Sequence, residues 1–324
     1  MLLAGDVGGT KTLLGLFEPA APRPVPVATQ TYSTAAFASF GDILVAFARD
    51  TKYWGGIVAA AIGAAGPVID GRARLTNIPW DIHEGDVAAR LKTKRAYVMN
   101  DLVAMASSAE TLTPDEAVVL QPGTVHPEGN AVVIAAGTGL GQAYLHRLHG
   151  RLRPVASEGG HADYAPRTDR EIELLRMLRA EHGRAETEHI LSGPGLLNVH
   201  RFTHGSQPCV PVRALPQEEW PAAISASALS GECHPCVDAL DIFVRVYGAE
   251  AGNLALRGVA TGGVYVGGGI APKILPALQD GRFLEAFNAK GTMSALVAAM
   301  PVKVIINPAA GLLGAAVRAQ ELLG

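Results

Sequence analysis

The sequence predicts an α/β protein of two domains, in which helices pack against mixed sheets. Its 324 residues exceed the length at which one hydrophobic core is usual, so two domains are expected. Apolar runs typical of strands alternate with segments of helical apolar spacing, which indicates helices covering sheets. Two strand–turn–strand units, at residues 2–15 and 131–146, have the same arrangement. They suggest topologically similar halves, although their residue match is too thin to establish a repeat.

The first hundred residues read in the order β-β-β-α-β-α-β. After the opening unit, a third strand follows a proline-rich turn, a helix has apolar spacing, and small apolar residues form a buried strand. Another strand then leads directly into a helix that contains alanine and methionine. The expected bounds of these elements are strand 25–32, helix 40–49, strand 56–62, strand 96–100 and helix 101–110.

The rest of the chain continues the alternation after the second strand–turn–strand unit. The expected elements are helices at 169–181, 195–202 and 236–257, a strand within 262–270 that ends in a glycine turn, a helix starting near 272, a strand at 303–306 and a helix at 311–323. We assign a small α/β domain to residues 1–110, completed by about 303–324, and a large one to 111–302. Because no Gly/Ser linker occurs, the boundary is expected where the chain crosses between domains.

Composition narrows the class of protein and its partners. Hydrophobic residues make up 48% and charged residues 18%, which is typical of a well-buried globular protein. Lys and Arg number 27 against 30 Asp and Glu, so no basic footprint for nucleic acid is present. The first residues lack the pattern of a signal peptide, and no apolar run is long enough to span a bilayer. We expect no membrane partner and a cytoplasmic location.

Three cysteines occur, and two of them, Cys233 and Cys236, have CxxC spacing. A zinc site needs about four ligands. Cys209 and His204 can complete such a set, but nothing in their spacing demands it. A redox CxxC would open a helix after a strand, and no clear strand precedes this one. Structural thiols are therefore the favoured interpretation.

Three glycine turns stand at the ends of expected strands. Glycines permit positive φ and leave no Cβ in the way, and consecutive N–H groups can converge on phosphate oxygens. A single turn of this kind is more often only a tight turn, but three together indicate a nucleotide site. Two hairpin loops can grip phosphates, and the third, which opens a helix, can pass under a nucleobase or ribose. The turns contain Gly8 and Gly9; Gly137, Thr138 and Gly139; and Gly267, Gly268 and Gly269.

The opening turn carries a carboxylate, a hydroxyl and a lysine. Asp6 ends the first strand, where its carboxylate can hold Mg²⁺ directly or through water, while Thr10 and Lys11 follow the glycines. An ordinary glycine-rich hairpin is the alternative, and for this segment taken alone it is slightly favoured. No P-loop or G-x-G-x-x-G fingerprint is present, so the P-loop and Rossmann classes are disfavoured.

Asn100-Asp101 closes a strand and opens a helix. Asp is a favoured N-cap, worth about 1 kcal/mol. Alternatively, the Asp101 carboxylate accepts a proton from a substrate hydroxyl at the edge of a cleft, worth roughly 10²–10⁴ in rate. From this dipeptide alone, capping is the favoured interpretation.

Further polar residues gather between apolar segments. Glu158 and His161 flank two glycines, a pattern suited to sugar hydroxyls because carboxylates accept and imidazole can donate hydrogen bonds. A polar surface turn, or a metal site that includes Asp163, is the alternative, and the metal site is rated lower. Glu188 is available for a ligand, whereas Ser192 is expected to cap a helix.

These motifs occur in the order found in bacterial glucokinases, which the sequence resembles over nearly its whole length, as far as 307–314. The combination is specific, although D-x-G-G-T alone is shared by many sugar kinases and related ATPases. The chain also looks like ROK-family sugar kinases, which usually carry a Cys-rich zinc motif after E-x-G-H. No cysteine occurs near His161, so the resemblance is to zinc-free glucokinases. The motifs are Asp6–Thr10, Asn100-Asp101, 137–141, 157–161, 191–195 and 267–270.

The resemblance implies an actin-like (ribonuclease H-like) fold of two domains with a cleft between them. It implies phosphorylation of the glucose 6-hydroxyl by ATP, the first step of glycolysis, with Asp101 as base. Asn100, Glu158, His161 and Glu188 would bind the other sugar hydroxyls. The glycine turns would hold ATP and Mg²⁺. Relatives of this size are often homodimers, and a homodimer is expected here.

Other functions stay open. The acceptor can be another hexose or an N-acyl hexosamine, and ADP or polyphosphate would use similar anion loops. A sugar-sensing regulator on the same fold is disfavoured, because no helix-turn-helix segment precedes the first strand and the charge is not basic. An ATPase acting on protein clients is also disfavoured, because that function would not explain why Glu158, His161 and Glu188 gather.

Overall fold

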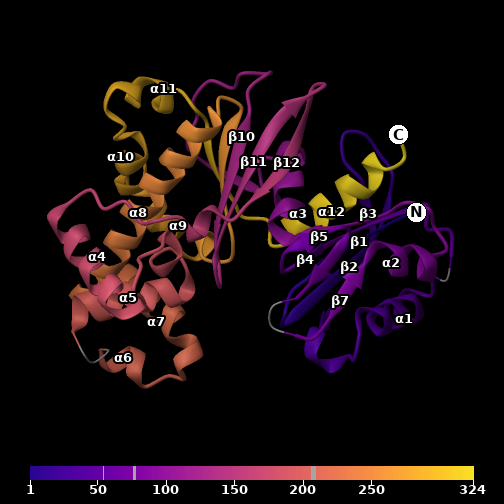
Figure 1. The fold of residues 1–324 in the computed structure, drawn as a ribbon, viewed down its shortest axis with the longest axis horizontal. Coiled ribbons are helices and arrows are strands. Elements are labelled where there is room, and N and C mark those ends of the chain that lie inside the picture. Colours follow the sequence, from indigo (N-terminus) through magenta and orange to yellow (C-terminus); the bar gives the residue numbers. More distant parts are fainter. Residues whose placement is uncertain (54, 76–77, 206–208) are drawn as a thin grey trace. The chain divides into compact units, whose positions relative to one another are not determined.

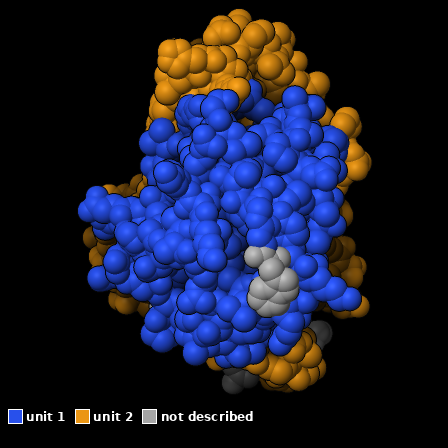
Figure 2. All heavy atoms as spheres, turned by 90° about the vertical axis from the view of Figure 1, so that its right-hand side faces the viewer, with its two compact units in different colours: residues 1–113, 152–156, 307–324 blue, residues 114–151, 157–306 orange. Residues whose placement is uncertain are grey.

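The computed structural model describes residues 1–53, 55–75, 78–205 and 209–324 (Figure 1). Strands and helices alternate along the chain, which confirms the predicted α/β class. The chain divides into two compact units, coloured blue and orange in Figure 2. Unit 1 comprises Met1–Thr113, Leu152–Ala156 and Asn307–Gly324, and unit 2 comprises Pro114–Arg151 and Ser157–Ile306.

Unit 1 is built on a sheet of order β3-β2-β1-β4-β8. β1 is antiparallel to β2 and parallel to β4, which is parallel to β8. The carboxyl ends of three parallel strands therefore meet at one edge, where binding residues of α/β proteins commonly lie. The strands are β1 (Leu2–Val7), β2 (Lys11–Glu18), β3 (Val25–Ser33), β4 (Ala59–Ala64) and β8 (Ala96–Asn100).

Helices cover both faces of this sheet. The alternation of side chains along a strand sends Leu3 and Ile62 toward a core shared with α1 (Phe40–Thr51), and Leu2 and Ala61 toward a core shared with α12 (Ala310–Glu321). The remaining elements of unit 1 are α2 (Glu84–Leu91), α3 (Asp101–Ser107), the 3₁₀ turns Thr34–Ala36 and Ala109–Thr111, and a small sheet of β5 (Val68–Ile69), β6 (Arg72–Arg74) and β7 (Asp81–His83).

Unit 2 contains strands in the order β11-β10-β13-β14-β9. β10 is antiparallel to β11 and parallel to β13, and β14 is parallel to β13. As in unit 1, a hairpin lies beside two further parallel strands, so the two halves share this topology. The strands are β9 (Ala117–Gln121), β10 (Ala131–Ala136), β11 (Leu140–Leu148), β13 (Gly263–Gly267) and β14 (Val302–Ile305).

The long helix α8 organises the helical part of unit 2 around fully buried aromatic side chains. Tyr247 of α8 lies edge-to-face with Phe243 and Phe283, and its hydroxyl accepts a hydrogen bond from Ala136 N. The helices are α4 (Asp169–His182), α5 (Gly193–His204), α6 (Val210–Arg213), α7 (Trp220–Ser230), α8 (His234–Gly258), α9 (Leu275–Gln279), α10 (Arg282–Asn288) and α11 (Ser294–Ala298), and the 3₁₀ turns are η3 (Gly159–His161), η4 (Thr187–His189), η5 (Gln217–Glu219), η6 (Ala271–Ile274) and η7 (Gly291–Met293).

Two segments differ from the expected domain bounds. The strand expected at 303–306 is β14, whose Val302 and Val304 are buried in the core of unit 2, so the C-terminal part of unit 1 begins at Asn307 rather than near 303. Most of β12 (Arg151–Ser157) belongs to unit 1, where Leu152 N donates to Glu110 Oε2 and Arg153 pairs with Glu321. Throughout the described part of the chain, no helix is long and apolar enough to cross a membrane.

Candidate active site

The first group of candidate residues lies at the carboxyl edge of the unit 1 sheet. The register pairs Asp6 with Gly63 and Ala64 with Asn100, so the ends of β1, β4 and β8 are level. At Gly63 a Cβ would lie 2.7 Å from Ala104 Cβ and 3.6 Å from Asp101 Cα. The missing side chain therefore lets α3 begin close against β4.

Asn100, not Asp101, caps α3. The Asn100 side chain accepts from Leu102 N at 2.9 Å and its Nδ2 donates to Gly66 O at 3.2 Å. The expectation that Asp101 is the N-cap of α3 was therefore wrong, because Asn100 occupies that position. Asp101 stands in the first turn, where Leu102 N also donates to its Oδ1 at 2.9 Å. This contact orients the carboxylate.

Asp6 is the last residue but one of β1 and has a half-buried position that suits a cation. The pKa of its carboxyl group is raised to about 6, chiefly by burial and also by the charge of Asp101, while Lys11 acts in the opposite direction. A Cβ on Gly311 would lie 2.6 Å from Asp6 Oδ2, so the carboxylate abuts the start of α12. Burial and neighbouring charges account for this shift of the Asp6 pKa. The oxygens of this carboxylate are the ligands that Mg²⁺ prefers, so the site fits that ion.

The opening turn joins β1 and β2 as the strand–turn–strand pattern predicts. Gly8 N donates to Lys11 O at 2.9 Å, and Thr34 Oγ1 donates to Gly8 O at 2.9 Å. Gly8 does not adopt positive φ, so backbone conformation does not require glycine there. Space does favour it, because a Cβ would lie 3.1 Å from Lys11 O. Thr10 and Lys11 are exposed beside this braced turn.

The second glycine turn, between β10 and β11, is held by an acidic side chain. Gly137 N donates to Gly139 O at 2.8 Å, while Gly193 N donates to Gly137 O at 2.8 Å. Glu188 Oε2 accepts from Leu140 N at 2.7 Å and would lie 2.6 Å from a Cβ on Gly139. One acid therefore supports this turn, in which Thr138 is exposed.

The third glycine turn lies beside the second. Gly267 pairs with Ala135 of the neighbouring parallel strand, and Ile270 N donates to Ala136 O at 3.2 Å. Gly268 has φ of 83°, and a Cβ there would overlap the Ala136 carbonyl. Both features require glycine. The helix expected near Pro272 begins as the 3₁₀ turn η6.

Glu158, His161 and Glu188 come together at η3 and η4. His161 Nδ1 lies 2.7 Å from Glu186 Oε2, and Thr187 N donates to Ala162 O at 3.0 Å. The hydrogen bond to Glu186 raises the pKa of His161, and the charges of Glu188, Glu186 and Glu158 add to this effect. The cluster is an acid-rich surface with a histidine whose side chain is 53% exposed, which suits hydroxyl groups.

Sequence reasoning missed Glu186. The only signal was its E-x-E spacing with Glu188, and its contact with His161 spans 25 residues. The alternative metal site at Glu158, His161 and Asp163 is wrong. Asp163 instead pairs with Arg184 Nε at 2.7 Å, and these three residues form no metal-binding group in the described part of the chain.

Glu186→Gln is expected to lower the pKa of His161. Folding raises the His161 pKa and lowers that of Glu186. The His161–Glu186 pair therefore stabilises the folded state only while both side chains are charged. This stabilisation is lost as pH falls through the lowered Glu186 pKa or rises through the raised His161 pKa. An NMR titration of the imidazole carbon-bound protons measures the change. Asp163→Asn, which removes only a partner of Arg184, is the control; an unchanged His161 pKa in Glu186→Gln would contradict the assignment.

The fold and these residue groups define a sugar kinase of the actin-like ATPase fold. A family model described as glucokinase matches residues 3–322. A glucokinase of a Synechocystis species is 38% identical, covering 98% of both chains, and one of Stenotrophomonas maltophilia is 34% identical, covering 99% of this chain and 95% of its own. The chain belongs to the glucokinase family.

Solved structures agree with this assignment. A crystal structure of glucokinase from an Antarctic psychrotroph superposes with a TM-score of 0.88 at 30% identity, covering 99% of this chain and 98% of its own. A ROK family glucokinase from Streptomyces griseus, solved with glucose and AMPPNP, gives a TM-score of 0.65 at 22% identity over 99% of each chain. The latter likeness shows the fold alone.

Proposed function

We propose that this chain transfers the γ-phosphoryl group of ATP to the 6-hydroxyl of glucose, with Asp101 as the general base. The observation that carries the proposal is the pair of carboxylates, Asp6 and Asp101, at one sheet edge. They are near enough that the charge of Asp101 raises the pKa of Asp6. One carboxylate is then suited to a metal–phosphate complex and the other to a hydroxyl proton.

Asp101 would take up a proton at the moment when the sugar oxygen attacks the γ-phosphorus. Its carboxylate accepts the proton of the 6-hydroxyl while that oxygen forms its bond to the γ-phosphorus, and the bond to the bridging oxygen breaks to release ADP. The Leu102 N–H donates to Oδ1 of Asp101 and so orients the carboxylate. General-base help of this kind typically contributes roughly 10²–10⁴ in rate.

The sugar-binding residues would be Asn100, Asp101, Glu158, His161 and Glu188. Carboxylates accept hydrogen bonds from hydroxyl groups. Glu186 raises the pKa of His161 and contacts its Nδ1, so that the imidazole donates through Nε2 when it is charged. Polar groups arranged in this way discriminate strongly against molecules lacking a hydroxyl, because a missing partner leaves them unsatisfied. The glucose complexes of the Streptomyces griseus and Balamuthia mandrillaris enzymes support glucose as the sugar.

The nucleotide would be bound by the three glycine turns. Gly8, Gly9, Thr10 and Lys11 supply N–H groups, a hydroxyl and a cation for phosphates; Gly137, Thr138 and Gly139 supply a second loop, and Gly267, Gly268 and Gly269 lie by the adenosine. Asp6 would hold Mg²⁺, directly or through water. There the ion would supply positive charge that neutralises the phosphate groups. The AMPPNP complex of the Streptomyces griseus relative supports ATP as donor.

A coupled assay tests the proposal. We expect the highest kcat/KM with glucose and ATP, lower values with mannose, fructose and N-acetylglucosamine, and little turnover with ADP or polyphosphate. Chelation with EDTA should abolish turnover and added Mg²⁺ should restore it. A higher kcat/KM for another sugar or donor, or turnover without a divalent cation, would overturn the corresponding assignment. We also expect a cytoplasmic location and a homodimer. Sedimentation analysis would check the homodimer, and cell fractionation the location.

A further inference from the structure

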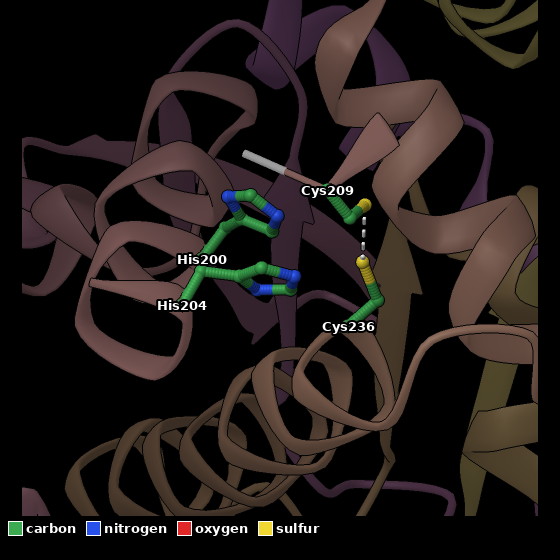
Figure 3. A group of neighbouring side chains, drawn as sticks. All are labelled: His200, His204, Cys209 and Cys236. Atoms are coloured by element: carbon green, nitrogen blue, oxygen red, sulfur yellow. Dashed lines mark hydrogen bonds between the residues drawn. The ribbon is translucent and has the colours of Figure 1, made fainter. Parts of the chain in front are cut away.

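Two histidines and two cysteines meet in unit 2, outside the groups assigned to sugar and nucleotide (Figure 3). His200 and His204 lie one turn apart on α5, Cys209 directly precedes α6, and Cys236 lies in the first turn of α8. Their potential ligand atoms all lie within 4.8 Å of one another. We call these four residues the His/Cys cluster.

The spacing of the two sulfur atoms matches a shared metal ion. Cys209 Sγ and Cys236 Sγ are 3.6 Å apart. A disulfide would place them about 2.0 Å apart, so they are not bonded. Two thiolates on one tetrahedral zinc, each about 2.3 Å from the ion, lie about 3.8 Å from each other. The sulfur pair therefore needs almost no movement to take up a zinc ion.

The histidines present buried nitrogen atoms that lack partners. His200 Nε2 and His204 Nδ1 make no hydrogen bond within the described part of the chain, and His200 is only 3% exposed. The two rings stack with centroids 4.0 Å apart and turn toward the sulfur atoms (Figure 3). Native proteins seldom leave such atoms unsatisfied, so an unpartnered imidazole nitrogen at this place points to a ligand.

Burial favours the neutral forms of His200 and of the Cys236 thiol. Burial, with the nearby His204, lowers the pKa of His200 to about 4, so the ring stays neutral as a ligand must. Burial raises the pKa of the Cys236 thiol. Without a cation, this thiol would therefore keep its proton.

We propose that His200, His204, Cys209 and Cys236 bind one Zn²⁺ in a tetrahedral structural site. Binding replaces the two thiol protons, which leave to solvent, with two sulfur–zinc bonds. The charges of Zn²⁺ and two thiolates cancel, which a buried position favours. Two sulfur and two imidazole ligands in a tetrahedral arrangement are typical of zinc rather than of Mg²⁺ or Ca²⁺. Four protein ligands leave no open position, so the role is structural.

Such a site would join the end of α5 and the nearby Cys209 to the start of α8, where Cys236 follows Cys209 by 27 residues. It would fasten the C-terminal end of α5 to the start of α8 through Cys209. At its other end, α5 begins with Gly193, whose N–H donates to Gly137 O in the second glycine turn. Zinc would therefore stabilise the helix that braces this turn without touching substrate. The proposal stands independently of the proposed function.

Cys233 provides a matched control on the same helix end. Its Sγ lies 3.2 Å from His204 Nε2, yet it is not among the four residues of the cluster. Cys233→Ser and Cys236→Ser remove the same atom from positions one turn apart. The proposal predicts that only the second variant loses the metal.

The test uses the full chain, purified without chelator and fully reduced. Elemental analysis by mass spectrometry should find about one zinc per chain. Cobalt exchanged for zinc should show thiolate charge-transfer absorption and the strong visible bands of tetrahedral cobalt. Cys209→Ser and Cys236→Ser should lose zinc, Cys233→Ser should retain it, and removal of zinc should lower the melting temperature of the wild type.

Several results would overturn the proposal. Reduced wild-type protein that takes up neither zinc nor cobalt has no such site, and this measurement needs no variant to fold. A Cys209–Cys236 disulfide in a non-reduced digest of freshly purified protein would assign the pair to redox chemistry instead. Loss of zinc in Cys233→Ser together with retention in Cys209→Ser would show that the ligand set is wrong.

Discussion

Asp101→Asn is expected to lower kcat by roughly 10²–10⁴ while glucose affinity keeps its order of magnitude. The amide has nearly the shape of the carboxylate and its oxygen still accepts from Leu102 N, which donates to Asp101 Oδ1 at 2.9 Å. It cannot take a proton from the sugar hydroxyl. Steady-state kinetics with the coupled assay and glucose binding by calorimetry measure the two quantities separately.

The matched control is Asp86→Asn. Asp86 is also an aspartate in the first turn of a unit 1 helix, α2. Both substitutions remove a charge that favours a helix N-terminus, an effect of about 0.3–1 kcal/mol. Only Asp101→Asn should slow turnover. Near-normal turnover in Asp101→Asn, or an equal loss in both variants, would exclude Asp101 as the base.

Much of the fold could be predicted because the relevant signals are local. The hairpins at 2–15 and 131–146 combine apolar strands with glycine turns, and β8 runs directly into α3. β9 was not predicted, because its place depends on distant residues. It pairs antiparallel with β14, and Gln121 Nε2 donates to Val297 O and Met300 O. No short-range pattern contains that information.

In the candidate site, too, local patterns predict some features, whereas contacts between distant residues could not be predicted. Asp6, Asn100 and Asp101 could be found from their positions at strand ends, since parallel strands bring their carboxyl ends to one edge. The approach of Gly311 to Asp6 was not predictable, because about three hundred residues separate them.

The His/Cys cluster was hidden for a different reason. The sequence named Cys209 and His204 as residues that can complete a zinc set with the CxxC cysteines, but structural thiols were favoured because nothing in the spacing demanded a site. His200 and His204 have the spacing of one helix face, which usually indicates packing. Only the folded arrangement of α5 and α8 brings their nitrogens to the sulfur of Cys236.

Gly314 marks a close contact between α12 and α3, in the same unit as Asp101. It lies on α12, where a Cβ would overlap the carbonyl oxygen of Ala104 in α3 and lie 2.9 Å from the N of Ser108, the C-cap of α3. That backbone has little freedom to retreat, because α3 is anchored at its start by the Asn100 cap and packs against β4 at Gly63. Glycine at 314 therefore sets how closely α12 and α3 pack.

Gly314→Ala sets two effects of opposite sign against each other. Helix propensity favours alanine by about 1 kcal/mol, whereas overpacking costs about 1–3 kcal/mol or more. Since the clash is with backbone, we expect overpacking to dominate, with net destabilisation of about 1–2 kcal/mol and a lower kcat from displacement of Asp101. Hydrogen exchange of the β1 and α12 amides measures the change in stability. Gly55→Ala, at an open and exposed position, is the control. Slower exchange in Gly314→Ala would mean that the two helices can separate at little cost, and that propensity rather than packing decides the outcome.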